Sequence, residues 1–154
     1  MKPNYILIPA LVISVAIAGS RLTGAGMDWY ATIHLPAWTP PGAIIGAVWT
    51  TIFTLCAAAI LKFWNSSPRD NRFRLTAGLF ALNGLLNVGW SYLFFFRQSI
   101  GAALFEMHLL LLSILLLIVL LYPRVKLSAV LLVPYAAWVA FATFLTYNVW
   151  VLNR

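Results

Sequence analysis

The sequence predicts an all-α protein, an integral membrane bundle of five transmembrane helices. Of its 154 residues, 63% are hydrophobic and 8% are charged, and the mean hydropathy is +0.93. This composition excludes intrinsic disorder and a soluble nucleic-acid-binding domain. Uncharged runs cover residues 3–20, 29–61, 75–96, 107–123 and 127–153. Each is long enough for a membrane crossing, which takes about 20 apolar residues.

The expected helices run over residues 5–23, 42–63, 74–96, 100–122 and 127–150. They occupy nearly the whole chain, so residues 1–154 are predicted to form a single transmembrane domain. Strand-like alternation is missing from these runs, which argues against a barrel.

The segment 5–23 has two interpretations. It begins after Lys2 and contains Ala16-Ile17-Ala18, so it could be a secretory signal with a small-residue cleavage site, or the first membrane span.

Basic residues predict the orientation of the bundle, because Lys and Arg are enriched on the cytoplasmic side. The N-terminus and the second and fourth connections share one side and carry seven of the ten: Lys2, Lys62, Arg69, Arg72, Arg74, Arg124 and Lys126. Arg21, Arg97 and Arg154 fall on the other side. We therefore expect the N-terminus in the cytoplasm, and the charge of +7 is explained by topology and anionic lipid headgroups.

The connection 24–41 is too aromatic and apolar for an ordinary solvated loop. Trp29, Tyr30 and Trp38 lie in it, together with three prolines. Such a segment buries its rings against helix ends or against lipid headgroups. It is interpreted as a lid over one mouth of the bundle or as an interfacial anchor.

Helix 74–96 carries two amides and two aromatic rings on one face. Asn83, Asn87, Trp90 and Phe94 stand at i, i+4, i+7 and i+11. Amides facing lipid are costly, so this face is expected to look into the bundle, where the amides bond neighbouring helices or meet a ligand.

Two further helices carry aromatic stripes. Trp49, Phe53 and Cys56 share a face of helix 42–63, and a second set lies on helix 127–150: Tyr135, Trp138, Ala142 and Leu145. One such stripe usually reflects packing, but three of them under an aromatic loop favour a cavity for a flat, largely apolar ligand.

Glu106 is the only acidic residue inside an expected span, so it should face inward, lie near the interface or be protonated. His108 lies about 200° around the same helix from it, and neither His108 nor His34 has an obvious set of metal-ligand partners. No metal site is expected, and no catalytic residue can be assigned because no nucleophile or phosphate-loop motif is present. The single Cys56 excludes an internal disulfide framework.

Several blocks together resemble the TspO/MBR family of translocator proteins and tryptophan-rich sensory proteins. They are Trp29-Tyr30, Leu35-Pro36-Ala37-Trp38-Thr39-Pro40-Pro41, Trp49-Thr50, Asn83, Asn87, Trp90-Ser91, Phe94-Phe95, Pro134-Tyr135, Trp138, Phe141-Ala142-Thr143 and Asn153. The blocks follow in order through essentially the whole chain. Thr146 stands where many members have asparagine, and the C-terminal sterol motif of animal members is not reproduced.

The resemblance implies a five-helix bundle, commonly a homodimer, that spans the bacterial cell membrane. It also favours reading segment 5–23 as a membrane span rather than as a secretory signal. It implies a pocket for tetrapyrroles, protoporphyrin IX or haem, and for isoquinoline-type molecules, with no required cofactor. The family pocket falls on Trp29, Trp38, Trp49, Phe53, Asn83, Asn87, Trp90, Tyr135, Trp138, Ala142 and Leu145.

Three functions are open at this point, beside a purely structural role in the membrane. The first is a receptor or sensor that binds a tetrapyrrole, and the second is an enzyme that degrades porphyrin with light and oxygen. The third is a porphyrin or sterol transporter, although five helices without an evident inverted repeat are a poor framework for one.

Overall fold

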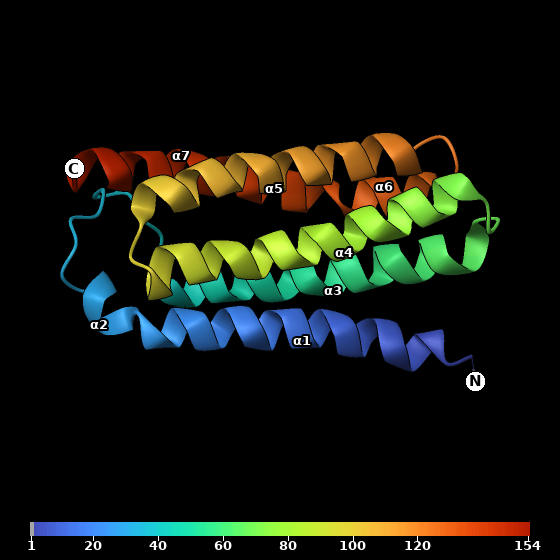
Figure 1. The fold of residues 1–154 in the computed structure, drawn as a ribbon, viewed down its shortest axis with the longest axis horizontal. Coiled ribbons are helices and arrows are strands. Elements are labelled where there is room, and N and C mark those ends of the chain that lie inside the picture. The colour runs from blue at the N-terminus through green and yellow to red at the C-terminus, as the bar shows by residue number, and fades with distance from the viewer. Residues whose placement is uncertain (1) are drawn as a thin grey trace.

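The computed structural model describes residues 2–154, and five long helices dominate it (Figure 1). The elements are α1 (Asn4–Ala25), α2 (Met27–Tyr30), α3 (Gly42–Ser66), α4 (Asn71–Ser91), the π-helix η1 (Tyr92–Phe96), α5 (Ile100–Leu121), α6 (Lys126–Leu131) and α7 (Val133–Leu152). Five segments are long and apolar enough to span a membrane: α1, α3, α4 with η1, α5, and α6 with α7. The predicted all-α bundle of five transmembrane helices is confirmed.

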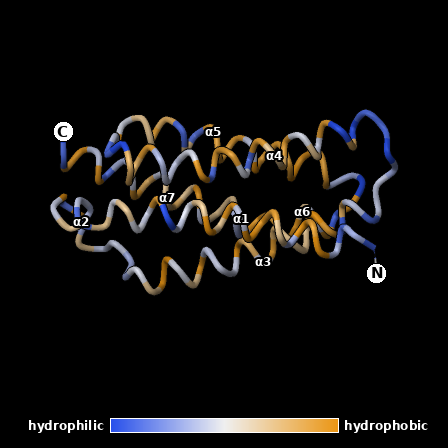
Figure 2. Tube along the Cα trace, turned by 60° about the horizontal axis from the view of Figure 1, so that its bottom comes forward, coloured by the Kyte–Doolittle hydropathy of each residue, from blue (hydrophilic) through white to orange (hydrophobic). Residues whose placement is uncertain are grey.

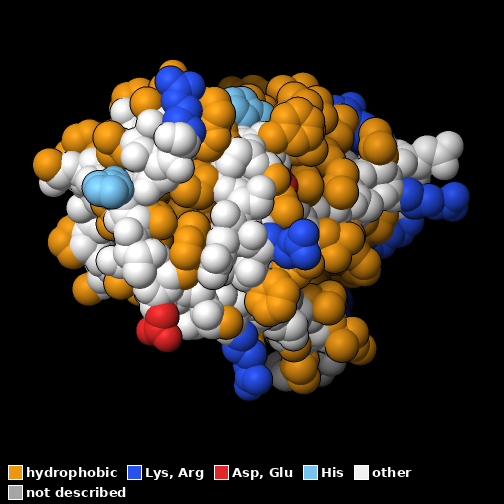
Figure 3. Space-filling view, turned by 60° about the vertical axis from the view of Figure 1, so that its left-hand side comes forward, with side chains coloured by type: hydrophobic (Ala, Val, Ile, Leu, Met, Phe, Trp, Pro, Cys, Tyr) orange, Lys and Arg blue, Asp and Glu red, His pale blue; other side chains and the backbone are white. Residues whose placement is uncertain are grey.

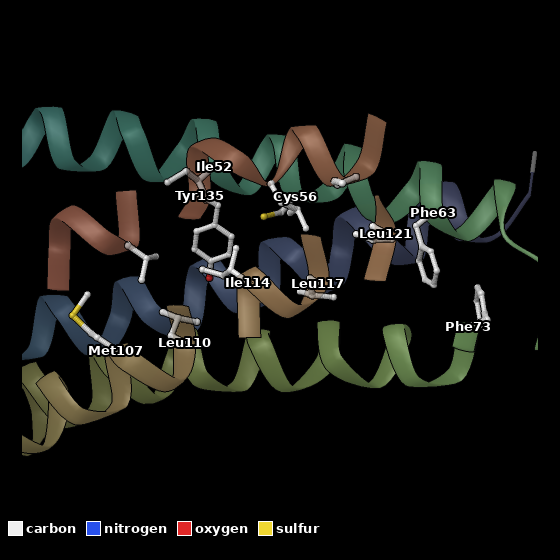
Figure 4. Close-up of a cluster of buried hydrophobic side chains, with 14 residues drawn as sticks. Ile52, Cys56, Phe63, Phe73, Met107, Leu110, Ile114, Leu117, Leu121 and Tyr135 are labelled. Carbon is white, nitrogen blue, oxygen red and sulfur yellow. The ribbon is translucent and has the colours of Figure 1, made fainter. Parts of the chain in front are cut away.

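The helices form a closed ring, because each packs against two neighbours in the order α1, α3, α6–α7, α5, α4 and back to α1. The core lies where α5 meets α4 and α7, and α5 contributes more of its fully buried side chains than any other helix, including Met107, Leu110, Ile114 and Leu117 (Figure 4). The lipid-facing surfaces expose large apolar residues such as Leu85, Phe105 and Val119. Apolar residues dominate the middle of the bundle, and polar residues gather towards its two ends (Figure 2).

Two irregularities interrupt the predicted spans. The first is η1, where the N–H of Arg97 bonds the carbonyl of Tyr92 at 2.8 Å and widens the helix to five-residue steps. The second lies at Leu132, where α6 ends and α7 begins just before Pro134. Proline has no N–H to donate, so it fits the first turn of α7 better than the interior of one continuous helix.

The chain termini lie at opposite ends of the bundle (Figure 1). At the N-terminal end, Asp70 caps α4 by accepting a hydrogen bond from the N–H of Phe73 at 2.8 Å, and it pairs with Arg124 at 2.6 Å. Arg124 and the Phe73 N–H hold the pKa of the Asp70 carboxyl at about 2. Charge and capping therefore join the α3–α4 and α5–α6 connections.

Candidate functional site

Residues 27–41, which we call the lid, close the end of the bundle opposite the N-terminus, and we call this the lid end. Its first part, α2, packs on η1, where Trp29 and Tyr30 both contact Phe94, with ring centroids 5.6 and 6.2 Å away. Burial there raises the pKa of the Tyr30 hydroxyl. Gly26 makes this approach possible, because a Cβ at that position would lie 2.5 Å from the carbonyl oxygen of Phe95.

The second part of the lid crosses to α7. Trp38 stacks on Phe144 at 5.6 Å and meets Phe141 edge-on at 6.0 Å. The side chain of Asn153 forms hydrogen bonds of 2.8 Å with the backbone N–H and carbonyl of His34. The lid therefore runs from η1 to α7 across the end of the bundle and then returns to α3 (Figure 1). Figure 3 turns this end of the molecule forward and shows apolar side chains interspersed with separate Lys or Arg side chains, His side chains and an acidic side chain.

The predicted polar face of α4 points into the bundle, as expected. Asn83 and Asn87 are each 8% exposed. The Asn87 amide donates to the Tyr135 hydroxyl at 3.1 Å, and that hydroxyl donates to Asn83 Oδ1 at 3.3 Å. The Asn83 amide donates to Ser113 Oγ at 2.8 Å. Figure 4 shows the Tyr135 ring reaching into the interior beside Ile114. The amides thus bond neighbouring helices, the first of the two roles considered for them.

Aromatic side chains surround this network on three helices. On α3, Trp49 stacks on Phe53 at 5.6 Å and meets Tyr135 at 6.0 Å. On α4, Trp90 stacks on Phe94 at 5.2 Å, and on α7, Trp138 lies 5.3 Å from Phe141. The indole Nε1 atoms of Trp90 and Trp138 are buried and form no hydrogen bond within residues 2–154.

The stripe on α7 divides by depth. Tyr135 is buried at 3% exposure, whereas Trp138, Ala142 and Leu145 are half-buried. Leu145 packs with Phe94 and Trp29 in the cluster beneath the lid, and Trp138 and Ala142 pack against the deeper core. The structure thus brings all the candidate residues to the lid half and middle of the bundle, on the lid, α3, α4 and α7.

The wall between α3 and α7 is the least tightly closed side of this region. The C-terminal half of α3 packs on α6, where Ser128 Oγ bonds the Ala59 carbonyl at 2.9 Å, but α3 and α7 approach each other at few points. Gly42, Ala43, Ile44, Gly46 and Ala47 at the start of α3 are all exposed. A Cβ on Gly42 or Gly46 would meet nothing within 4 Å, so this GxxxG motif makes no close contact within the described chain.

Two hollows, of about 450 and 560 Å³, lie elsewhere, along the outer side of α1. One is lined by α1 residues from Ile13 to Arg21, and the other runs between α1 and α4 past Leu85 and Tyr92. Neither is lined by a residue of the predicted pocket.

Glu106 faces inward, which is one of the three situations expected for it. It is 6% exposed, and neither of its carboxyl oxygens finds a hydrogen-bond partner in residues 2–154. His108 is exposed and bonds the Leu104 carbonyl on its own helix. No group of three His, Cys, Asp or Glu side chains suited to a metal occurs among the described residues.

Sequence reasoning missed three partners of the predicted residues. Ser113 accepts from Asn83, and Phe141 and Phe144 hold Trp38. A hydroxyl within the apolar run 109–121 was a usable signal for Ser113. Phe141, three residues after Trp138, continues the same helix face.

Comparison with known proteins agrees with this arrangement. The model of the TspO/MBR family matches residues 6–151. The tryptophan-rich protein TspO of Chlorobaculum tepidum is 37% identical, covering 93% of this chain and 91% of the relative. The TspO of Bacillus cereus is 33% identical over 99% of both chains. The human translocator protein is 32% identical over 97% of this chain and 92% of its own length.

These matches run from the first helix to the last and cover the tryptophans, the paired asparagines and the lid described above. Together with the five apolar helices, they show a multi-pass integral membrane protein surrounded by a lipid bilayer. The chain belongs to the TspO/MBR family.

Proposed function

We propose that this protein is a membrane receptor of the sensor or translocator kind that binds a flat tetrapyrrole such as protoporphyrin IX or haem. The observation that carries the proposal is the pair of aromatic clusters that the lid bridges. Trp29, Phe94 and Trp90 lie on one side, and Trp38, Phe141 and Trp138 lie on the other.

A planar macrocycle suits such surroundings because its faces stack on indole and phenyl rings. In this proposal it enters along the loosely closed wall between α3 and α7, beside Trp49 and Phe53. The Asn83–Tyr135–Asn87 network forms a rigid polar floor. The propionates of a porphyrin stay near water at the lid end, where Arg21 and Arg97 supply positive charge.

Isoquinoline-type molecules are expected to bind the same region, because they offer a smaller flat surface to the same rings. The bundle needs no cofactor for its own packing in this proposal, so the tetrapyrrole is a ligand.

The test uses the purified protein in detergent with protoporphyrin IX, read by quenching of tryptophan fluorescence. The Trp138→Phe and Asn87→Ala variants should weaken binding about tenfold. Trp64→Phe is the matched control, since Trp64 lies at the opposite end of the bundle against Phe73 and Arg69. Absence of quenching at micromolar porphyrin would contradict the proposal, and equal losses in all three variants would contradict the location.

The orientation is part of the proposal. The structure groups the N-terminus with the α3–α4 and α5–α6 connections at one end (Figure 1), and these carry most of the basic residues. We infer that this end faces the cytoplasm of a bacterial cell membrane and that the lid faces outward. Single cysteines at Lys2 and Arg154, placed in a Cys56→Ser background, should react with an impermeant maleimide from opposite sides.

The homodimer implied by the family is proposed as the assembled form. Light scattering on the detergent-solubilised protein measures its mass directly, and a monomeric mass would contradict it.

A further inference from the structure

Glu106 carries unused hydrogen-bonding capacity inside the bundle. Its carboxyl group is buried between α5 and its neighbours, and both oxygens lack a partner in residues 2–154. Nearby polar groups do not satisfy it, because Tyr135, Asn83 and Asn87 bond one another. A buried polar group without a partner is costly, so one in a native fold requires an explanation.

The register of α4 and α5 places Trp90 and Glu106 at the same level of the bundle. These helices are antiparallel, and the bond between Asn83 and Ser113 fixes their alignment. Trp90 follows Asn83 by seven residues, and Glu106 precedes Ser113 by seven. Seven residues are almost two full turns, about 10.5 Å along the axis, so both side chains lie at one height on the faces that meet.

Trp90 offers the complementary group. Its Nε1 is buried and unpaired within the described residues, like the Glu106 oxygens. Stacking on Phe94 at 5.2 Å and edge contact with Phe95 at 5.8 Å hold the plane of the indole, so the direction of its N–H is fixed. A donor with a fixed direction and an acceptor therefore stand at the same level, without bonding each other.

We propose that Trp90 and Glu106 form a subsite that recognises an amide-type edge on a flat ligand, an N–H group next to a carbonyl. The Trp90 N–H donates to the carbonyl oxygen, and a Glu106 oxygen accepts from the ligand N–H. A purely hydrocarbon edge leaves both protein groups unsatisfied, and a carboxylate edge brings no donor for Glu106. This subsite rests on the proposed function, because it lies within the same aromatic site.

The test compares two tricyclic probes that differ at one atom, 6(5H)-phenanthridinone and its N-methyl derivative. Both are flat and carry the carbonyl, but only the first has the N–H. Calorimetric titration of the unaltered protein should show about tenfold tighter binding of the N–H probe. Glu106→Met, which keeps the length of the side chain and removes both oxygens, should abolish this preference. His108→Met on the exposed face of the same helix should retain it.

Trp90→Phe provides a second variant that keeps a ring but removes the donor. It should weaken the binding of both probes by a similar factor and leave the ratio of their affinities unchanged. This variant replaces Glu106→Met as the test if Glu106→Met does not fold. Equal binding of the two probes to the unaltered protein overturns the subsite. A preference that persists in Glu106→Met also overturns it, because the discrimination is then steric.

Protoporphyrin IX separates failure of the subsite from failure of the function. If the porphyrin binds but the probes show no N–H preference, the amide subsite is wrong and the receptor function stands. If neither the porphyrin nor the probes bind, both proposals fall.

Discussion

The side chain of Asn153 forms two hydrogen bonds with the backbone of His34, 119 residues earlier in the chain. Its Oδ1 accepts from the His34 N–H, and its Nδ2 donates to the His34 carbonyl, each at 2.8 Å. This pairing of a side-chain amide with a peptide group holds the lid to the last turn of α7. It is the only side-chain hydrogen bonding between the lid and another element of the described chain.

Replacing Asn153 should therefore loosen the lid without unfolding the bundle. Asn153→Ala removes both bonds to His34 and also the bond from Nδ2 to the Val149 carbonyl. The two bonds to His34 are exposed, so their net contribution is modest, about 1 kcal/mol together. Amide hydrogen exchange of residues 31–40 should accelerate about fivefold, while exchange in α5 stays unchanged. Asn148→Ala is the control, since Asn148 bonds only the Phe144 carbonyl of its own helix. Unchanged lid exchange in Asn153→Ala would show that the stacking of Trp38 alone retains the lid.

Tyr135→Phe should destabilise the centre of the bundle. The hydroxyl joins Asn83 to Asn87, so its loss leaves two buried amides short of a partner. We expect a loss of about 1–2 kcal/mol in the free energy of unfolding, measured by denaturant titration in detergent micelles. Tyr5→Phe, which alters an exposed ring, should be neutral. Equal stability of the two variants would mean that the amides find other partners.

The Asp70–Arg124 pair should make stability depend on pH at the acidic end. The pKa of Asp70 is lowered from 3.8 to about 2 by Arg124 and the Phe73 N–H, so the folded state favours the ionised carboxylate. When folding lowers a pKa, the resulting stability is fully present at pH values above the pKa of the unfolded state, and it is lost as the pH falls through the pKa of the folded state.

The Asp70→Asn variant should accordingly melt below the unaltered protein at pH 5–7, and the difference should disappear between pH 4 and pH 2. Added salt should reduce it, because the pair is solvent-accessible. Asp28→Asn is the control, because it removes an exposed carboxylate that forms no ion pair within residues 2–154. A difference that is independent of pH would assign the effect of Asp70 to its neutral capping bond.

The sequence was sufficient to predict the five spans because lipid demands long apolar helices whatever their partners. It also predicted the inward face of α4, since Asn83 and Asn87 are too polar for lipid. The π-helix at Tyr92–Phe96 had no such signal in the spacing of its residues; in the structure its Phe94 and Phe95 pack against Tyr30 of α2. The contact of Asn153 with His34 depends on how two distant segments meet, which local periodicity does not contain.

The packing of α2 on η1 gives a last prediction, at Gly26. Its φ of −104° is accessible to any residue, so the need for glycine is steric. An added Cβ would lie 2.5 Å from the Phe95 carbonyl oxygen and 2.7 Å from the Phe95 Cβ, and both atoms belong to η1 rather than to the far end of a flexible side chain. Gly26→Ala should therefore displace α2 and cost about 1–3 kcal/mol.

Displacement of α2 also moves Trp29 away from Phe94, so porphyrin affinity should fall together with stability. Gly24→Ala, two residues earlier in α1, meets no atom within 4 Å and should preserve both. Thermal unfolding and quenching titrations on the two variants measure these effects separately. If Gly26→Ala keeps its thermal stability but binds porphyrin more weakly, the lid moves as a unit. If it keeps both its stability and its affinity, η1 yields to the added methyl group, and its contact with α2 does not position the lid.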